Sequence, residues 1–264
     1  MVVARLYGGL GNQMFQYAAA LAAAERLDSR LLVDATWFRS VGTKVDRAYG
    51  LDAFGIEPTS PLALRLNRLL RRPRVVREND SDSPIGLHGA VELDGYWQSE
   101  RCFAGAEQRV RETFRFVAAE PALAEELRRT ESVSVHVRRG DYVAPKRAAR
   151  FGVLDPVYYE QALALVRERV REPRVVVFSD DPEWCRDRFD GEVVATGDPA
   201  TDVRLMAACR HHVVANSSFS WWGAWLGETD GAVVVAPAQW YRDPTLGRGD
   251  TVPERWLRVD PYWS

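Results

Sequence analysis

The sequence is poor in cysteine, and neither sign of charge dominates it. Its three cysteines, Cys102, Cys185 and Cys209, lie far apart and lack the CxxC or Cys/His spacing of a zinc site. We therefore expect neither a disulfide framework nor bound zinc, and we expect a reducing, cytoplasmic compartment. The 35 basic and 37 acidic residues give a formal charge of −2, so the composition offers no electrostatic basis for binding nucleic acid.

Long hydrophobic runs are also missing. No stretch approaches the roughly 18 consecutive apolar residues of a membrane-spanning helix, and Met1 leads into an apolar run without the basic leader of a signal peptide. Membrane contact is therefore expected to be peripheral at most. The four histidines have no metal-ligand spacing, and no Gly-x-Ser-x-Gly motif marks a hydrolase nucleophile. The sequence thus predicts no metal and no cofactor.

What the sequence does contain is an alternation of strand-like and helical segments. At roughly 150 residues per domain, 264 residues correspond to about two domains. The first half opens with a β-rich run (2–7), a glycine turn (8–11), an Ala-rich helix (12–27) and a second short run (30–34). This order is typical of a βαβ unit.

The second half alternates more regularly. Five short β-branched runs occupy residues 133–138, 174–179, 192–196, 211–216 and 232–236. The segments between them are long enough for crossover helices, at 156–170, 182–189, 202–209 and 218–226. This pattern predicts an α/β fold with a parallel, doubly wound sheet. With a further helix predicted at 122–129, we place a boundary near residue 130, between domains 1–130 and 131–264.

Residues 62–77 carry six arginines and no acidic residue. Four leucines share an i, i+4, i+7, i+8 spacing that predicts a basic amphipathic helix: Leu62, Leu66, Leu69 and Leu70. We expect the leucines to pack on the core and the arginines to be solvated. The alternative is a surface for anionic lipid, or for a phosphate-bearing, lipid-linked acceptor. Beyond this segment we expect a loop (79–84), a strand (86–97) and a helix (100–114).

In an open parallel sheet, ligands bind beyond the carboxyl ends of the strands. Three predicted strands of the second half run into polar segments there, at 136–142, 179–181 and 216–220. Arg138 and Arg139 follow the first of these strands, and guanidinium groups match phosphate oxygens with paired hydrogen bonds. We predict that they bind a diphosphate; the alternative is a pair of surface ion pairs.

Two helix starts offer further candidates. Ser217 or Ser218 is predicted as an N-cap. Taken alone, this segment favours plain capping, with Trp221, Trp222 and Trp225 in the core; the alternative is an anion site formed by the free N–H groups of that first turn. Asp180 and Asp181 resemble carboxylates that hold a divalent metal on a nucleotide-sugar. Because Pro182 follows them, we favour Asp181 as an N-cap with proline at the first helical position.

Asp202 precedes a helical run and is interpreted either as an N-cap or as a carboxylate that accepts hydrogen bonds from guanine. Residues 8–13, GGLGNQ, fit neither the P-loop nor the dinucleotide-binding template. Their placement between a strand and a helix still permits close approach of the backbone to a ligand.

Six blocks together resemble the bacterial α-1,2-fucosyltransferases, inverting GDP-fucose-dependent enzymes of glycosyltransferase family 11. The blocks are GGLGNQMFQYA (8–18), LDGYWQSE (93–100), SVSVHVRRGDY (132–142), VFSDDPEWC (177–185), NSSFSWWGAWL (216–226) and VVVAPAQW (233–240). The resemblance implies a GT-B fold, in which two Rossmann-like domains face a central cleft. The second domain would hold GDP-fucose without a metal, the first would provide the acceptor side, and residues 256–263 would pack back across the halves.

The resemblance also implies roles for individual residues. It assigns the diphosphate to Arg138 and Arg139, the nucleotide to His136 and guanine to Asp202. Asn12, Ser217, Ser218 and Phe219 would complete the donor site near the phosphates.

No catalytic base carries over from the family pattern. We choose Asp141, with Asp34 and Asp155 as alternatives. Asp141 could equally orient Arg138 or Arg139.

The expected reaction moves L-fucose from GDP-β-L-fucose to the 2-hydroxyl of a galactose in a glycan acceptor, forming an α-1,2 linkage. One alternative is a fucosyltransferase with another linkage or a protein acceptor. A second is a non-catalytic GDP-sugar-binding module, and a third is a metal-dependent transferase that uses Asp180 and Asp181. The expected location is the cytoplasm, with peripheral contact at the inner face of the membrane as the alternative.

Overall fold

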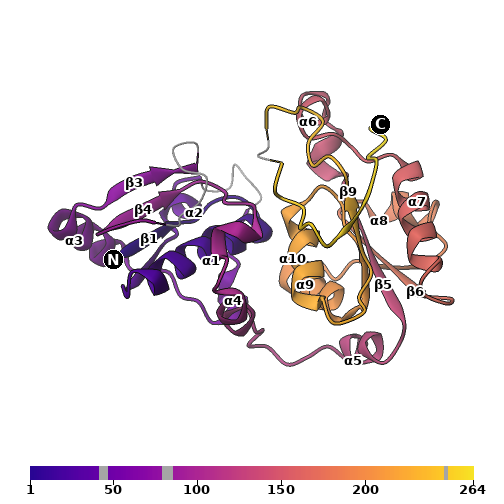
Figure 1. The fold of residues 1–264 in the computed structure, drawn as a ribbon, viewed down its shortest axis with the longest axis horizontal. Helices are drawn as coiled ribbons and strands as arrows, with labels where there is room; N and C mark the ends of the chain where they lie inside the picture. Colours follow the sequence, from indigo (N-terminus) through magenta and orange to yellow (C-terminus); the bar gives the residue numbers. More distant parts are fainter. Residues whose placement is uncertain (42–46, 79–85, 247–248) are drawn as a thin grey trace. The chain divides into compact units, whose positions relative to one another are not determined.

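The computed structural model of the protein describes residues 1–41, 47–78, 86–246 and 249–264, with the side chains of residues 40 and 41 excepted (Figure 1). The chain forms two compact units, Met1–Ala118 and Ala119–Ser264. The division therefore falls before helix α5 (Ala122–Arg128), not after it near residue 130. The reason is that α5 packs against α9 (Pro199–Ala208) of unit 2, where Arg204 also donates to the Ala119 carbonyl at 2.8 Å.

Unit 1 is a four-stranded parallel sheet in the order β2-β1-β4-β3. Helix α1 packs on one face, and helix α3 packs on the other through Leu64, which joins Val3 and Leu32 in a small apolar cluster. The strands are β1 (Val2–Arg5), β2 (Leu31–Asp34), β3 (Arg74–Arg77) and β4 (Val91–Asp94). The helices are α1 (Leu10–Arg26), α2 (Thr36–Val41), η2 (Leu51–Phe54), α3 (Pro61–Arg71), η4 (Glu100–Phe103) and α4 (Glu107–Thr113).

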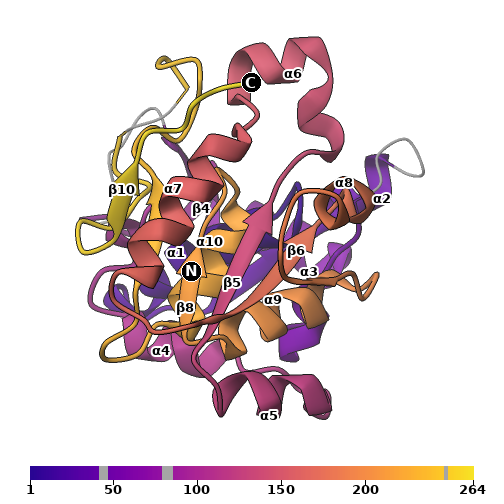
Figure 2. The same cartoon turned by 90° about the vertical axis from the view of Figure 1, so that its right-hand side faces the viewer.

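Unit 2 is a six-stranded parallel sheet in the order β10-β9-β8-β5-β6-β7. Because side chains alternate along a strand, Val133 and Val135 of β5 face helix α7, whereas His136 faces α10 on the other side (Figure 2). The strands are β5 (Ser132–Val137), β6 (Arg174–Ser179), β7 (Glu192–Val194), β8 (His211–Val213), β9 (Val234–Pro237) and β10 (Leu257–Val259). The remaining helices are η5 (Gly140–Val143), α6 (Pro145–Phe151), α7 (Pro156–Arg167), α8 (Pro182–Arg186) and α10 (Ser218–Gly227).

The five strands predicted for the second half are all present, and the α/β architecture is confirmed. The structure adds β10, whose three residues are too few for a periodic signal. It also divides the predicted helix 100–114 into η4 and α4, because Gly105 lies between them with φ 83°. The predicted loop 79–84 lies outside the described residues.

The basic segment 62–77 departs from its prediction in two ways. Its helix ends at Arg71, because Pro73 cannot continue it, and residues 74–77 form β3 beside β4. The predicted packing of the leucine stripe on the core is wrong, because Leu64 is the buried leucine of α3 and the four leucines of the stripe are exposed. The physical reason is that Arg68 of α3 pairs with Asp34 and Glu92 on the sheet and so fixes which side of the helix faces it.

The C-terminal segment packs within unit 2. Strand β10 pairs with β9, and the ring centroid of Trp256 lies 5.6 Å from that of Trp221 in α10. The backbone of Trp263 forms an isolated antiparallel β-bridge with Leu154. The tryptophans of α10 are buried, as predicted, and all three cysteines are free and buried. Within the described ranges, the helices fall short of the length and hydrophobicity needed to cross a bilayer.

Candidate functional site

The order in which the chain adds strands to the sheet of unit 2 reverses between β5 and β8. The chain proceeds outward from β5 through β6 to β7, and from β8 it proceeds the other way through β9 to β10. The crevice beyond the carboxyl ends at such a switch point is where open parallel sheets bind ligands. The rings of His136 and Phe219 lie 5.5 Å apart there. The topology thus brings together two of the polar segments predicted from the sequence.

Asp180 at the end of β6 holds the turn that follows β5. Its Oδ2 lies 2.6 Å from the Arg138 guanidinium, and its Oδ1 accepts from the backbone N–H groups of Arg139 and Gly140 at 2.8 and 3.1 Å. A Cβ on Gly140 would collide with this carboxylate, so the turn requires glycine. Asp180 therefore fixes both the backbone and the first arginine of the pair.

Arg139 is held separately. Its Nε donates to Asp181 Oδ2 at 3.1 Å, and its guanidinium lies over the Trp184 ring at 4.1 Å from the centroid. Asp181 also caps α8 by accepting from the Trp184 N–H at 3.3 Å, with Pro182 at the first position, so the predicted cap is confirmed. Among the described residues, no hydrogen bond or ion pair engages the Nη atoms of Arg139. They are oriented donors available to an anion.

The two acids after β6 thus hold arginines. Within residues 1–41, 47–78, 86–246 and 249–264, no group of three or more His, Cys, Asp or Glu side chains could hold a metal ion. Asp180 and Asp181 lie close enough to Arg138 and Arg139 that a cation bound there would compete with two guanidinium groups.

Asp141 is bound by two arginines. Its Oδ1 pairs with Arg138 Nη2, and its Oδ2 lies 2.8 Å from Arg147 Nη1. A carboxylate in two ion pairs must leave one of them to accept a proton from a substrate. The geometry therefore favours the interpretation in which Asp141 orients Arg138 over the one in which Asp141 is the catalytic base.

The other two candidate bases are also engaged. Asp34 accepts from Thr36 N and Oγ1 at 2.9 and 2.6 Å and pairs with Arg68 at 2.5 Å. Burial by itself raises the pKa of Asp34, but these hydrogen bonds and the Arg68 charge outweigh it and lower the pKa. Asp155 caps α7 by accepting from Val157 N at 3.1 Å and accepts from the C-terminal Ser264 hydroxyl at 3.0 Å.

His136 is a buried, neutral histidine. Burial and the positive Arg138 lower its pKa to about 3, so the ring is uncharged at neutral pH. Its Nδ1 has no hydrogen-bond partner among the described residues. A buried, unpaired ring nitrogen normally has a partner in the functional state of a protein. His136 is therefore suited to a ligand contact.

Helix α10 begins at the same edge of the sheet. Of the two serines predicted as caps, Ser217 is the N-cap and accepts a hydrogen bond from the Phe219 N–H at 3.3 Å. Ser218 is the first helical residue. The first turn contains no acidic residue, so the partial positive charge of the helix end is not neutralised within that turn.

Asp202 lies inside the first turns of α9 and is not its cap. The cap is Asp198, which is followed by proline and accepts from Ala200 N and Thr201 N at 3.3 and 2.9 Å. Asp202 Oδ1 instead accepts from the Thr196 hydroxyl at 2.7 Å, and burial raises the pKa of Asp202. In the described part of the chain, no hydrogen bond ends on its Oδ2. The N-cap interpretation of Asp202 is wrong, and the base-binding role stays a prediction.

Asn12 lies in unit 1, in the first turn of α1, directly after the glycine turn that follows β1. Its Oδ1 accepts from Gln98 Nε2 at 2.7 Å, and a Cβ on Gly8, which has φ 83°, would contact the Asn12 amide at 2.8 Å. The neighbouring Gln13 is fully buried and binds the Gly8 and Ala48 carbonyls at 3.1 and 2.9 Å. The block GGLGNQ therefore forms a turn and the start of α1, held in place by these contacts. The role of Asn12 toward the sugar-diphosphate stays a prediction.

The family model for glycosyl transferase family 11 matches residues 77–260, which is more than half of the chain. The chain belongs to glycosyltransferase family 11. It is also 34% identical to an alpha-1,2-colitosyltransferase of Escherichia coli, with 98% of this chain and 99% of that protein aligned. A second relative is the O-antigen biosynthesis glycosyltransferase WbnK of Escherichia coli, with 28% identity over 89% of this chain and 93% of that protein.

A shorter match covers 37% of this family 11 glycosyltransferase and 29% of galactoside alpha-(1,2)-fucosyltransferase 1 of Sus scrofa, at 41% identity. Among solved structures, the NodZ alpha-1,6-fucosyltransferase co-crystallized with GDP has a TM-score of 0.50 and 17% identity over 84% of this chain and 90% of that one. The predicted GT-B fold is confirmed. The protein is a fucosyltransferase-like glycosyltransferase.

Sequence reasoning missed several residues that build the site of this glycosyltransferase. Asp180 was considered only as a metal ligand, an interpretation less favoured than the cap at Asp181, and Trp184 and Thr196 were not singled out. The sequence did contain one signal. Asp180 and Asp181 directly follow the strand β6, which neighbours β5, and are therefore well placed to pair with the two arginines that follow β5. Asn216 was also missed; its buried amide donates to the Phe151 and Gly152 carbonyls at 2.8 and 3.2 Å and ties β8 to α6.

Proposed function

We propose that this glycosyltransferase transfers L-fucose from GDP-β-L-fucose to the 2-hydroxyl of a galactose in a glycan acceptor and forms an α-1,2 linkage. The observation that carries the proposal is the pair Arg138 and Arg139, held in fixed directions at the switch point where α10 also begins. The α-1,2 linkage is supported by the names of two relatives, a colitosyltransferase and a galactoside fucosyltransferase.

In the proposed reaction the galactose O2 attacks fucose C1 from the face opposite GDP. The bond from C1 to the diphosphate oxygen breaks, its electron pair leaves with GDP, and the β-linked donor becomes an α-linked product. Arg138, Arg139 and the start of α10 stabilise the negative charge that develops on the diphosphate. The hydroxyl proton passes to solvent water as the new bond forms. Because Asp141 is held in two ion pairs, we propose that it acts mainly by positioning Arg138, and that base catalysis contributes less.

The donor would be recognised at several points around this pair. We propose that Asp202 accepts hydrogen bonds from the guanine N1–H and exocyclic amine, because its Oδ2 is open while Thr196 holds Oδ1. His136 would contact the nucleotide through Nδ1. Ser217, Ser218 and Phe219 would contact the phosphates at the start of α10, and Asn12 would contact the sugar-diphosphate.

The deciding experiment incubates the purified protein with GDP-fucose and lactose or another β-galactoside. We expect release of GDP and a product whose NMR spectrum and methylation analysis show fucose α-linked to galactose O2. A different linkage would contradict the proposal. Binding of GDP by calorimetry without release of GDP in the presence of any acceptor would indicate a non-catalytic module. Complete loss of activity in EDTA that added divalent metal restores would indicate the metal-dependent alternative.

A second candidate is transfer of colitose in place of fucose. The observation that favours it is the full-length 34% identity to the alpha-1,2-colitosyltransferase. A competition assay with both GDP-sugars would separate the two. We expect a higher kcat/KM for GDP-fucose. A higher value for the colitosyl donor would show that the transferred sugar is colitose, and the proposed role of Arg138 and Arg139 at the diphosphate would still hold.

A further inference from the structure

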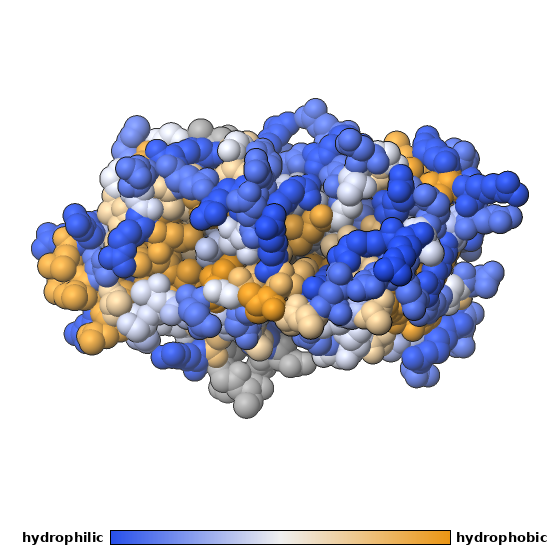
Figure 3. Space-filling view, turned by 90° about the horizontal axis from the view of Figure 1, so that it is seen from below, coloured by the Kyte–Doolittle hydropathy of each residue, from blue (hydrophilic) through white to orange (hydrophobic). Residues whose placement is uncertain are grey.

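Helix α3 of unit 1 turns its leucine stripe away from the sheet. The exposed fractions of Leu62, Leu66, Leu69 and Leu70 are 77%, 52%, 68% and 70%, against 1% for Leu64. Figure 3 shows an apolar patch at the left end of the molecule, where α3 lies in Figure 1, with hydrophilic residues around it. Soluble proteins seldom leave a contiguous apolar surface of this kind without a partner.

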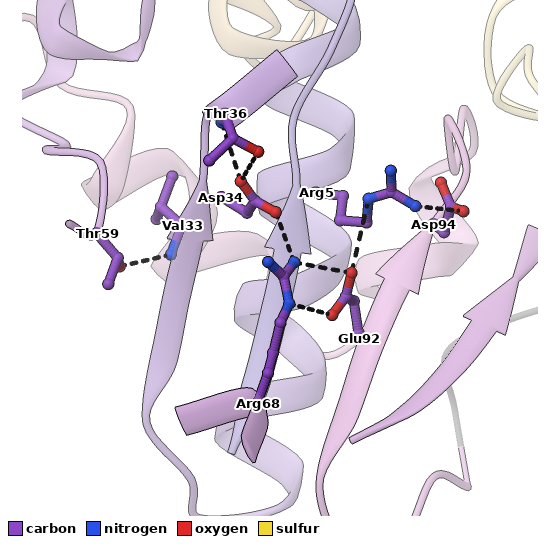
Figure 4. Close-up of polar contacts among 8 residues, drawn as sticks. All are labelled: Arg5, Val33, Asp34, Thr36, Thr59, Arg68, Glu92 and Asp94. Atoms are coloured by element: carbon purple, nitrogen blue, oxygen red, sulfur yellow. Dashed lines mark hydrogen bonds and ion pairs between the residues drawn. The ribbon is translucent and has the colours of Figure 1, made fainter. Parts of the chain in front are cut away.

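The outward direction of the stripe is enforced by charge. Parallel pairing places Val3, Leu32 and Glu92 in one row of the sheet, and Asp34 lies on the same face at the end of β2. Arg68 reaches from α3 to both carboxylates, at 2.5 Å from Asp34 and 2.8 Å from Glu92 (Figure 4).

Rotation of α3 to bury the stripe would separate Arg68 from these acids. It would leave Asp34, whose side chain is only 5% exposed, without an arginine beneath leucines, and Glu92, 9% exposed, with only its longer ion pair to Arg5 at 3.6 Å. Buried, unpaired charges are strongly unfavourable. The exposed stripe is therefore a stable feature of the fold.

The charged side chains of the segment that carries the stripe, residues 61–77, have one sign. Arg65, Arg71, Arg72 and Arg77 are exposed, and among the described residues none of them forms an ion pair or hydrogen bond through its side chain. Residues 61–77 contain no acid. An apolar helix face flanked by unpaired arginines is complementary to a surface with anionic headgroups above hydrocarbon, because apolar insertion and charge attraction act together.

We propose that α3 docks this protein onto an anionic phospholipid membrane. The helix would lie in the plane of the interface, with its four outer leucines among the acyl chains and its arginines at the headgroups. Its 11 residues give a length of roughly 16 Å, enough to present all four leucines at once. The inference goes beyond the proposed function and does not rest on it, because membrane docking requires no catalysis.

The test is co-sedimentation of the full chain with vesicles. We expect binding to phosphatidylethanolamine vesicles that contain about 30% phosphatidylglycerol, weak binding to pure phosphatidylcholine, and release by about 0.5 M NaCl. The double variants Leu66→Ser/Leu69→Ser and Arg65→Glu/Arg71→Glu should each lower the apparent partition coefficient about tenfold or more. Matched controls at exposed sites elsewhere, Val117→Ser/Val157→Ser and Arg167→Glu/Arg171→Glu, should bind as the wild type does.

Thermal unfolding checks that the variants are folded, and transfer to a soluble β-galactoside should be unchanged in all four. Equal binding to neutral and anionic vesicles, or wild-type binding by both α3 variants, would overturn the proposal. So would a wild-type dimer in sedimentation velocity that Leu66→Ser/Leu69→Ser converts to monomer, since the stripe would then be a protein interface.

Discussion

Arg68 in unit 1 and Arg138 in unit 2 are each held between two carboxylates beside a parallel sheet, yet their surroundings differ. Arg68 projects from a helix onto the face of the sheet, where Arg5 pairs with Asp94 nearby and the acids outnumber the arginines. Arg138 projects from the carboxyl end of a central strand, at a switch point, beside a helix start and a neutral histidine. An arginine between two acids therefore does not by itself mark a functional site. The two arginines differ in their place in the topology, and this difference is why we propose a ligand-binding role for Arg138 and a structural role for Arg68.

The largest effect should come from Arg138. We expect Arg138→Ala to lower kcat/KM with GDP-fucose about 10²–10³-fold, because one preorganised stabiliser of the leaving group is lost. Its unfolding free energy should change far less than that of the Arg68 variants. Steady-state kinetics and thermal denaturation of the same preparation measure both. If folded Arg138→Ala kept the wild-type turnover rate, the proposed role of Arg138 in the transfer reaction would be wrong.

Arg68 should show the opposite pattern. Arg68→Leu leaves Asp34 without an arginine and Glu92 with only the longer ion pair to Arg5. It should lower the unfolding free energy by about 2 kcal/mol, a value reduced because Arg68 is partly exposed. Denaturant unfolding would measure the loss, and kcat/KM of the remaining folded protein should stay near wild type. The double variant Arg68→Leu/Glu92→Leu should recover part of the stability, because one uncompensated charge is removed.

The third prediction concerns the base of the nucleotide. If Asp202 accepts hydrogen bonds from guanine, Asp202→Asn should weaken GDP binding about 10- to 100-fold, the value of a charge-assisted pair. Binding of a nucleotide without the exocyclic amine, IDP, should fall less. Calorimetry with both nucleotides measures the difference. Equal loss for GDP and IDP would argue that Asp202 acts through the structure of α9.

The pH dependence of unit 1 gives a smaller effect. The folded pKa of Asp34 is lowered below its unfolded value, so its stabilisation is fully present above about pH 4, the unfolded pKa of aspartate. That stabilisation is lost as the pH falls through the lower folded pKa. The wild type should therefore lose stability below about pH 4 more steeply than Arg68→Leu, in which Asp34 has lost its arginine. Denaturant unfolding at several pH values tests this, and parallel slopes would contradict it.

The smallest effect is expected at the start of α10. Ser217→Ala removes the cap of the helix and should cost about 1 kcal/mol of stability. Affinity for GDP should fall only a few-fold, because the N–H groups of the first turn remain. Calorimetry and thermal unfolding measure the two quantities. A loss of GDP affinity as large as that of Arg138→Ala would assign the hydroxyl a direct contact with the phosphates.

The comparison also shows what the sequence can and cannot predict. Periodicity placed the strands of unit 2 and put Arg138 at a strand end, because β-branched runs and their polar ends are local features. Periodicity also showed that the leucines of α3 share a face. It could not show which way that face points, because Asp34 and Glu92, distant in the sequence, fix the rotation through Arg68. The cap of α9 was predictable: Asp198 is followed by Pro199, the same signal that identified Asp181 before Pro182, whereas Asp202 lacks it.

The central claim is that the carboxyl ends of the unit 2 strands hold the GDP moiety, whereas the arginines of α3 do not. Hydrogen–deuterium exchange with and without GDP tests it directly, because both regions are measured at once. We predict slower exchange on adding GDP in peptides that cover 136–142, 196–202 and 216–220, and no change in peptides that cover 61–77. Protection of 61–77 with no change around Arg138 would contradict the account.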